Sequence, residues 1–174
     1  MAERCADPAV HKSLEVDLAL VSSYDALLRD VELTILKTAK QHDTNTLYLL
    51  QTVPGIGKML RLVLLDAIHH IDRFPRRQEF ASSCRLGTCA KESNGKRSGT
   101  SGATIGNAHL TWAFSEAAVF FRRDNPAGQK FLVRLEKKHD KGKALTILAH
   151  KLARAVYYML KRKVAFDMKR FLND

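Results

Sequence analysis

The fold class that the sequence predicts is all-α, or nearly so. In several segments the apolar residues are spaced by three and four positions, as on one face of a helix, whereas the alternating pattern of strands is weak throughout. The chain of 174 residues has only 9 glycines, and five of them fall within residues 86–106. Outside that segment few residues interrupt helices, so long helices joined by one glycine-rich region are expected.

The N-terminal part predicts one long helix. No Gly or Pro occurs between Val10 and Val53, and five apolar residues follow one another in steps of three or four: Leu20, Tyr24, Leu27, Val31 and Ile35. This spacing is close to a coiled-coil seam, and a second helical segment is expected from Thr46. A single apolar stripe cannot bury itself, so residues 1–45 are interpreted as an arm that forms a homo-oligomer, and residues 46–174 as the domain that follows it.

The domain begins with short helices and then changes in composition. A helix is expected over residues 58–68, and Pro75 should end any helical segment at or before Phe74. A further short helix is expected over residues 76–83. The stretch LGTCAKESNGKRSGTSGATIG, residues 86–106, is predicted as a long exposed loop or a loop with short strands, and loops of this length are usually functional or disordered.

Three helices are expected after this loop. Asn107 is suited to cap the first of them, and Asn125-Pro126 should end it. Residues 127–138 are expected to form the second helix. The last is expected over residues 144–162, with a buried stripe of five residues: Leu145, Leu148, Leu152, Val156 and Leu160.

The charge is distributed unevenly along the chain. Residues 1–52 hold 5 Lys/Arg and 8 Asp/Glu, a net charge of −3, whereas residues 53–174 hold 24 Lys/Arg and 10 Asp/Glu, a net charge of +14. Such an excess predicts a polyanionic partner. Nucleic acid is favoured over a membrane because no amphipathic surface helix rich in Trp, Phe and Lys accompanies the charge. The alternative is a generally basic soluble domain.

Other classes of protein fit the sequence less well. The longest apolar runs are too short to span a bilayer, and the N-terminus has no apolar segment typical of a secretory signal. Three cysteines without C-x-x-C spacing indicate free thiols in a reducing cytoplasm. The histidines have no carboxylate or cysteine at ligand spacing, so no metal site is expected in this chain.

Two glycines interrupt the helical pattern at residues 53–58, in the sequence VPGIGK. This has the form of a helix-hairpin-helix, in which glycine lets backbone N–H groups approach a phosphate with no Cβ in the way. The N-terminus of the second helix and Lys58 add positive charge. Gly55, Gly57 and Lys58 are therefore predicted to bind the DNA backbone without reading its sequence. The alternative is a packing corner with Ile56 as its buried plug.

The loop at residues 86–106 combines hydroxyl groups with cations. Lys91, Lys96 and Arg97 are predicted to bind nucleic acid, since they can neutralise phosphate charge beside a hydroxyl that attacks a phosphodiester. Ser93 is one of several hydroxyl residues here, and no base that would remove its proton is evident. A serine in such a loop is more often a spacer than a nucleophile.

A series of short motifs resembles one known family. In chain order they are the hairpin at residues 53–57, Asp72-Arg73-Phe74, Phe80-Ala81 with Leu86, Glu92-Ser93, and Gly106-Asn107 with Leu110. Over residues 49–165 the order and spacing resemble the C-terminal transposase domain of IS110-type insertion sequences, whose transposases are guided by a bridge RNA. The helix over residues 14–40 is similar to the coiled-coil segment that precedes this domain in the family.

The resemblance implies roles for particular residues. In the family a serine of this loop attacks DNA and becomes joined to phosphate, and Ser93 stands at the matching position. An RNase H-like domain at the N-terminus of family members supplies acidic residues that bind magnesium. Residues 1–52 have no strand pattern that would carry those acids, so no cofactor is assigned to this chain. Residues 84–85, 94, 104 and 111 also depart from the family pattern.

The resulting expectation is a truncated transposase that acts in DNA transposition and recombination but not alone. Its expected partners are DNA and guide RNA, and its expected place is the bacterial cytoplasm, at the nucleoid. The alternatives are a non-catalytic helix-hairpin-helix module that binds DNA, and an inactive remnant of a transposase.

Overall fold

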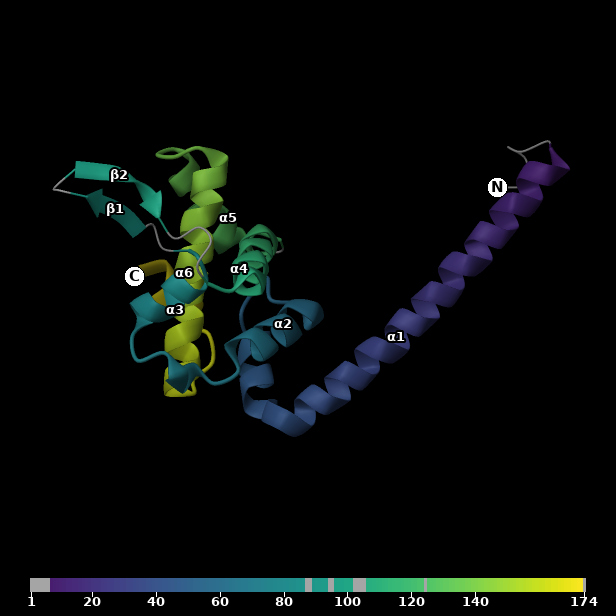
Figure 1. Ribbon diagram of the computed structural model, residues 1–174, viewed down its shortest axis with the longest axis horizontal. Helices are drawn as coiled ribbons and strands as arrows, with labels where there is room; N and C mark the ends of the chain where they lie inside the picture. The colour runs from purple at the N-terminus through teal and green to yellow at the C-terminus, as the bar shows by residue number, and fades with distance from the viewer. Residues whose placement is uncertain (1–6, 87–88, 94–95, 102–105, 124, 174) are drawn as a thin grey trace. The chain divides into compact units, whose positions relative to one another are not determined.

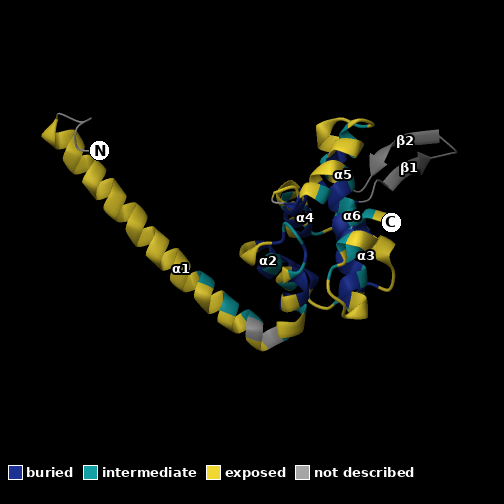
Figure 2. Ribbon diagram, turned by 180° about the vertical axis from the view of Figure 1, so that it is seen from behind, coloured by how far each residue is buried: buried dark blue, intermediate teal, exposed yellow. Residues whose placement is uncertain are grey.

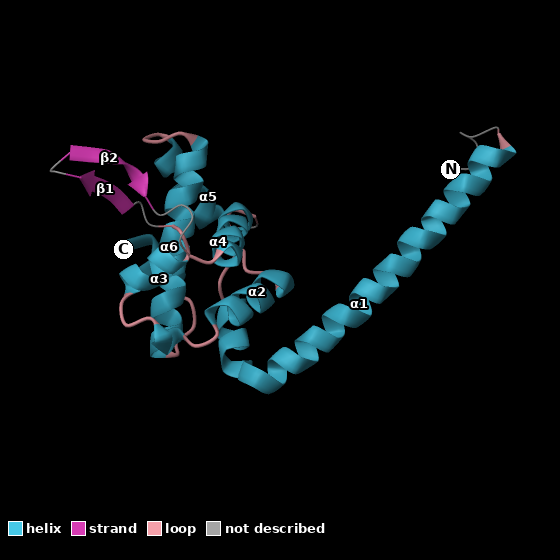
Figure 3. Cartoon of the chain, viewed as in Figure 1, coloured by secondary structure: helices cyan, strands magenta, loops and turns pink. Residues whose placement is uncertain are grey.

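The computed structural model describes the backbone of residues 7–86, 89–93, 96–101, 106–123 and 125–173 (Figure 1). Helices make up most of it, and the strands among these residues form one two-stranded hairpin (Figure 3). The prediction of a nearly all-α protein is therefore confirmed. In chain order the elements are α1 (Pro8–Gln51), α2 (Lys58–Ile68), the 3₁₀ turn η2 (Ile71–Arg73), α3 (Arg77–Ser83), β1 (Cys89–Ser93), β2 (Lys96–Ser101), α4 (Ala108–Phe121), α5 (Pro126–Glu136), α6 (Lys141–Arg162) and α7 (Met168–Asn173).

The chain forms two compact units, residues 1–42 and residues 43–174. Helix α1 runs through the boundary, where Asp43 has non-helical backbone angles, with φ −155° and ψ 82°. The Asp43 carboxylate accepts a hydrogen bond of 2.9 Å from the Thr46 N–H and thereby caps the segment that follows. Burial alone would raise the pKa of the Asp43 carboxyl. The hydrogen bonds from Thr46 and Asn45 together lower it by more than burial raises it, so the net shift is downward. The sequence-based division at residue 45 stays a prediction.

The first unit exposes its apolar side chains. The five residues of the seam predicted from the sequence are 45–65% exposed (Figure 2): Leu20, Tyr24, Leu27, Val31 and Ile35. Among the residues of α1 whose burial is described, Leu47 is the first buried one, and it lies beyond the break. Among the described residues, no helix is long and apolar enough to cross a membrane.

The core of the second unit is built around α6, which contacts α3, α4 and α5 (Figures 1 and 2). Four residues of the predicted α6 stripe are buried, whereas Leu145 is half-buried. The Phe80 ring is fully buried, and its centroid lies 5.1 Å from that of Phe74, 6.1 Å from that of Phe114 and 5.9 Å from that of Tyr157. Residues from the end of η2, α3, α4 and α6 thus share one aromatic cluster, and the unit has a continuous core.

Polar residues set the starts of the later helices. Asn107 caps α4 by accepting hydrogen bonds from the N–H groups of His109 and Leu110, as predicted. Asn125 is buried: its Oδ1 accepts from the Gly128 N–H and its Nδ2 donates to the Phe121 carbonyl, both at 3.0 Å. It therefore joins the end of α4 to the start of α5, whose first residue is Pro126.

Candidate nucleic-acid interface

The turn between α1 and α2 packs into the core through its apolar residues. Val53 and Ile56 are 2% and 5% exposed. The turn is closed by backbone hydrogen bonds from the Val53 N–H to the Leu50 carbonyl and from the Ile56 N–H to the Val53 carbonyl. Ile56 is thus a buried plug, as in the packing-corner alternative.

Gly55 is required by packing against α4. Its φ of 86° lies in the left-handed region, and a Cβ built there would lie 2.5 Å from the Ala117 carbonyl oxygen and 2.7 Å from the Phe121 backbone nitrogen. Both neighbours are backbone atoms, which cannot rotate away. The absence of a side chain at this position is therefore explained without a nucleic acid.

Gly57 has different surroundings. Its backbone is extended, with φ −76° and ψ −176°, and a Cβ built there would meet nothing within 4 Å. It is the N-cap of α2 and supplies no side-chain hydrogen bond to the first turn, while Gly57 and Met59 are exposed. Of the two glycines, only Gly57 has the open surroundings that close approach of a phosphate would need.

Strands β1 and β2 place the predicted loop residues opposite one another. Strands β1 and β2 are antiparallel, and in their register Ser93 is opposite Lys96 and Glu92 is opposite Arg97, with an irregularity between Lys91 and Glu92. Ser93 is the last residue of β1 and Lys96 the first of β2, so both stand at the turn end of the hairpin. The side chains of this hairpin lie outside the described residues. Their roles stay predictions.

Cys84 is excluded as a nucleophile or metal ligand. The side chain is fully buried, and this burial raises the pKa of its thiol to about 12, against a smaller lowering by Arg73. The thiol therefore stays protonated near neutral pH.

The described residues also contain no group of three His, Cys, Asp or Glu side chains that could hold a metal ion. They do not fit the magnesium site of the family resemblance, and no reaction step through that ion is assigned to this chain.

Residues 47–132 match the model of the transposase IS116/IS110/IS902 family. Over these residues the chain has a transposase domain of this family. A search of the curated proteins found no match.

The matched segment of the transposase domain runs from the end of α1 into α5. Its Asp72-Arg73-Phe74 motif is structural. The Arg73 Nη2 donates to the Ala67 carbonyl at 3.0 Å, and the Arg73 guanidinium lies 4.5 Å from the centroid of the Phe74 ring. Asp72 accepts a hydrogen bond of 2.6 Å from Lys161, which is the main cause of its lowered pKa. This motif ties the transposase domain to α6, outside the match.

The binding residues predicted from the sequence do not include the cations of α6 and α7 that line a pocket with Arg77. Lys151, Arg154 and Arg162 follow one another in steps of three and eight residues, which places them on one side of a helix, beside the predicted apolar stripe. That spacing was a signal in the sequence. No signal in the sequence indicated that these residues line the same pocket as Arg77 and Arg170, because α3 and α7 are distant from each other in the chain.

Proposed function

We propose that this chain is the part of an insertion-sequence transposase that holds duplex DNA during transposition, and that Gly57 lies at the contact. The main observation is the open, side-chain-free start of α2 inside the family-matched segment. A phosphate there would meet the positive end of the helix and the backbone N–H groups of its first turn. The net charge of +14 after residue 52 supports attraction of a polyanion.

Two substitutions at Gly57 test this contact. Aspartate and serine are both good N-caps, so neither should destabilise α2. Gly57→Asp places a negative charge where the phosphate would lie, and we expect it to weaken duplex DNA binding about tenfold. Gly57→Ser adds only a small polar group and should change the affinity much less. Fluorescence anisotropy with a labelled duplex at several salt concentrations measures both.

Lys58→Gln is a companion variant. It should reduce the slope of log affinity against log salt by about 0.9, as expected for the loss of one phosphate contact. Equal affinities of the Gly57→Asp and Gly57→Ser proteins for duplex DNA would show that the phosphate is not bound at this corner.

We further propose that Ser93 is the nucleophile. The support is its match to the family position and its place at the turn end of the hairpin, opposite Lys96. Attack by its hydroxyl oxygen on phosphorus would form a Ser–phosphate ester, break the bond from phosphorus to the sugar oxygen of the cleaved strand, and release that oxygen as a hydroxyl that carries the proton lost by the serine. Lys91, Lys96 and Arg97 would then neutralise the phosphate charge.

Ser93→Ala should abolish a covalent protein–DNA adduct and leave DNA affinity nearly unchanged. The adduct is assayed on denaturing gels after incubation with DNA, magnesium and a full-length relative of the family. Ser98→Ala, in β2 of the same hairpin, is the control and should keep the adduct. An adduct that persists in the Ser93→Ala protein would exclude this serine.

Two alternatives have distinct outcomes in these experiments. DNA binding without any adduct indicates a non-catalytic binding module. Neither binding nor adduct indicates an inactive remnant. Whether the chain acts as a transposase or as a binding module, we propose that its exposed apolar seam, residues 20–35, pairs with a second copy of the chain. We also propose guide RNA as a further partner.

A further inference from the structure

A pocket of about 510 Å³ lies in the second unit, with walls from α3, α6 and residues 164–171. Of the described residues that line it, only Arg77 belongs to the family-matched segment. We propose that this pocket binds one unpaired nucleotide of a nucleic-acid strand, with its phosphate on the arginines and its base on the apolar wall. This goes beyond the proposed function, which places duplex DNA at the turn before α2.

The charge of the pocket fits a phosphate. Its described lining carries a single carboxylate, Asp167, against five cations: Arg77, Lys151, Arg154, Arg162 and Arg170. The Asp167 carboxylate already accepts hydrogen bonds from the N–H groups of Lys169, at 2.8 Å, and Arg170, at 3.2 Å, as the cap of α7. None of the four arginines forms an ion pair with a carboxylate of the described residues. The positive charge of these arginines is therefore not neutralised by the described carboxylates, and it would attract an anion into the pocket.

Arg154 gives a second indication of an anion. It is half-buried in the pocket wall, and its Nε–H is buried without a hydrogen-bond acceptor among the described residues. A buried N–H group without an acceptor is costly, and an oxygen of a bound phosphate would reduce that cost. The pKa of the neighbouring His150 is lowered, first by burial and then by the charges of Arg154 and Arg77.

The apolar wall fits a base. Met159, Val164 and Phe166 line the pocket together with the buried Phe171, whose ring centroid lies 5.3 Å from that of Phe166. A phosphate alone would make no favourable contact with this apolar surface. Unpaired nucleotides are commonly bound by aromatic and apolar side chains next to arginines, because the base stacks while the phosphate is neutralised. A volume of about 510 Å³ lies within the range of pockets that hold small organic groups.

Tyr158 connects the two parts of the pocket. Its hydroxyl accepts a hydrogen bond of 3.3 Å from the Arg77 Nη1, and the Arg162 guanidinium lies 5.1 Å from the centroid of its ring. The tyrosine thus holds two of the cations beside the apolar wall.

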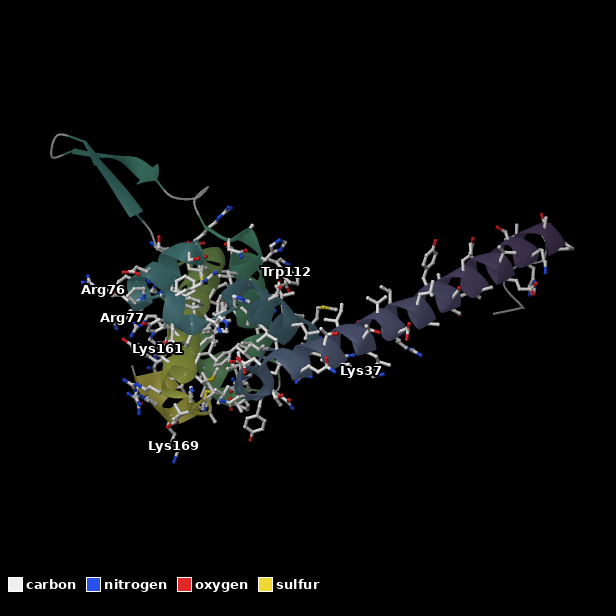
Figure 4. The ribbon with its side chains drawn as sticks, turned by 60° about the horizontal axis from the view of Figure 1, so that its bottom comes forward. Lys37, Arg76, Arg77, Trp112, Lys161 and Lys169 are labelled. Atoms are coloured by element: carbon white, nitrogen blue, oxygen red, sulfur yellow. The ribbon has the colours of Figure 1, made fainter. Side chains whose placement is uncertain are left out.

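The surface around the pocket favours a strand over a free nucleotide. Figure 4 shows Arg76, Arg77 and Lys161 gathered on one side of the second unit, with Lys169 farther along the same edge and Trp112 elsewhere. Lys161 is paired with Asp72, whereas Arg76 and Lys169 are exposed at the ends of α3 and α7. Cations that extend past the pocket can bind the phosphates on either side of the unpaired nucleotide.

The test compares two pairs of arginines in the full chain. Arg162→Gln with Arg170→Gln removes two exposed charges from the pocket, and Arg122→Gln with Arg123→Gln removes two exposed charges elsewhere. Anisotropy is measured with a labelled single-stranded RNA of about 12 nucleotides, the same sequence as DNA, a DNA strand with central abasic sites, and a duplex. We expect the pocket pair to weaken single-strand binding about tenfold and duplex binding much less. The control pair should have equal, small effects on both.

Each comparison has an outcome against the proposal. Equal losses of single-strand affinity in the two arginine pairs would overturn the site. Equal affinity of the normal protein for the base-bearing and abasic strands would overturn the role of the apolar wall. The RNA and DNA arms identify the kind of strand. Gly57→Asp should act in the opposite sense, weakening duplex binding more than single-strand binding, so the two sites can fail independently.

Discussion

Gly55→Ala should destabilise the second unit by at least about 3 kcal/mol. The new Cβ would lie 2.5 Å from the Ala117 carbonyl oxygen and 2.7 Å from the Phe121 nitrogen, and the φ of 86° disfavours any residue with a side chain. Relief requires α4 to move away from the turn, which would open the core at Phe121. Urea unfolding followed by the fluorescence of Trp112, the single tryptophan and a residue of α4, measures the loss.

Gly57→Ala is the matched control for this prediction. It adds the same methyl group two residues later, where a Cβ meets nothing within 4 Å and the backbone is extended. Its cost should stay below about 1 kcal/mol, the usual difference between glycine and alanine at an N-cap. Similar urea midpoints for the two alanine variants would mean that the turn does not pack on α4 as described.

Phe80→Ala should remove about 3–5 kcal/mol of stability. The ring is fully buried and contacts aromatic rings from three other elements, so truncation leaves a cavity whose walls cannot close independently. Thermal and urea unfolding of the full chain measure the change.

Phe120→Ala supplies the comparison. Phe120 is 39% exposed and its ring lies under the Arg123 guanidinium, 5.6 Å from ring centroid to guanidinium carbon, at the surface. Its truncation should cost less than about 1 kcal/mol. If the two phenylalanine variants lost equal stability, the ring cluster around Phe80 would not be the centre of the core.

Local signals in the sequence were sufficient for most helices. The three- and four-residue spacing predicted α6 and most of its buried stripe, and Asn107 was identified as a cap because its side chain acts on the next few residues. Leu145 is only half-buried, near the N-terminal end of α6. Periodicity tells which side of a helix faces inward, but not how far along the helix the covering elements extend.

The two glycines of the turn could not be distinguished from the sequence. Both stand beside Ile56, and the difference between them comes from the backbone of α4, which is distant in the chain. The basic pocket has the same origin, since three separate elements supply its arginines. Long-range contacts of this kind leave no pattern in a short window.

The shared aromatic cluster has a practical consequence for the boundaries of the domain. The family match ends at residue 132, but Tyr157 of α6 donates hydrogen bonds to the carbonyls of Phe74 and Pro75 and packs against Phe80. A fragment cut at the end of the match would expose these apolar surfaces to water. The matched segment and the folding unit therefore have different limits, and α6 belongs to every fragment intended to fold.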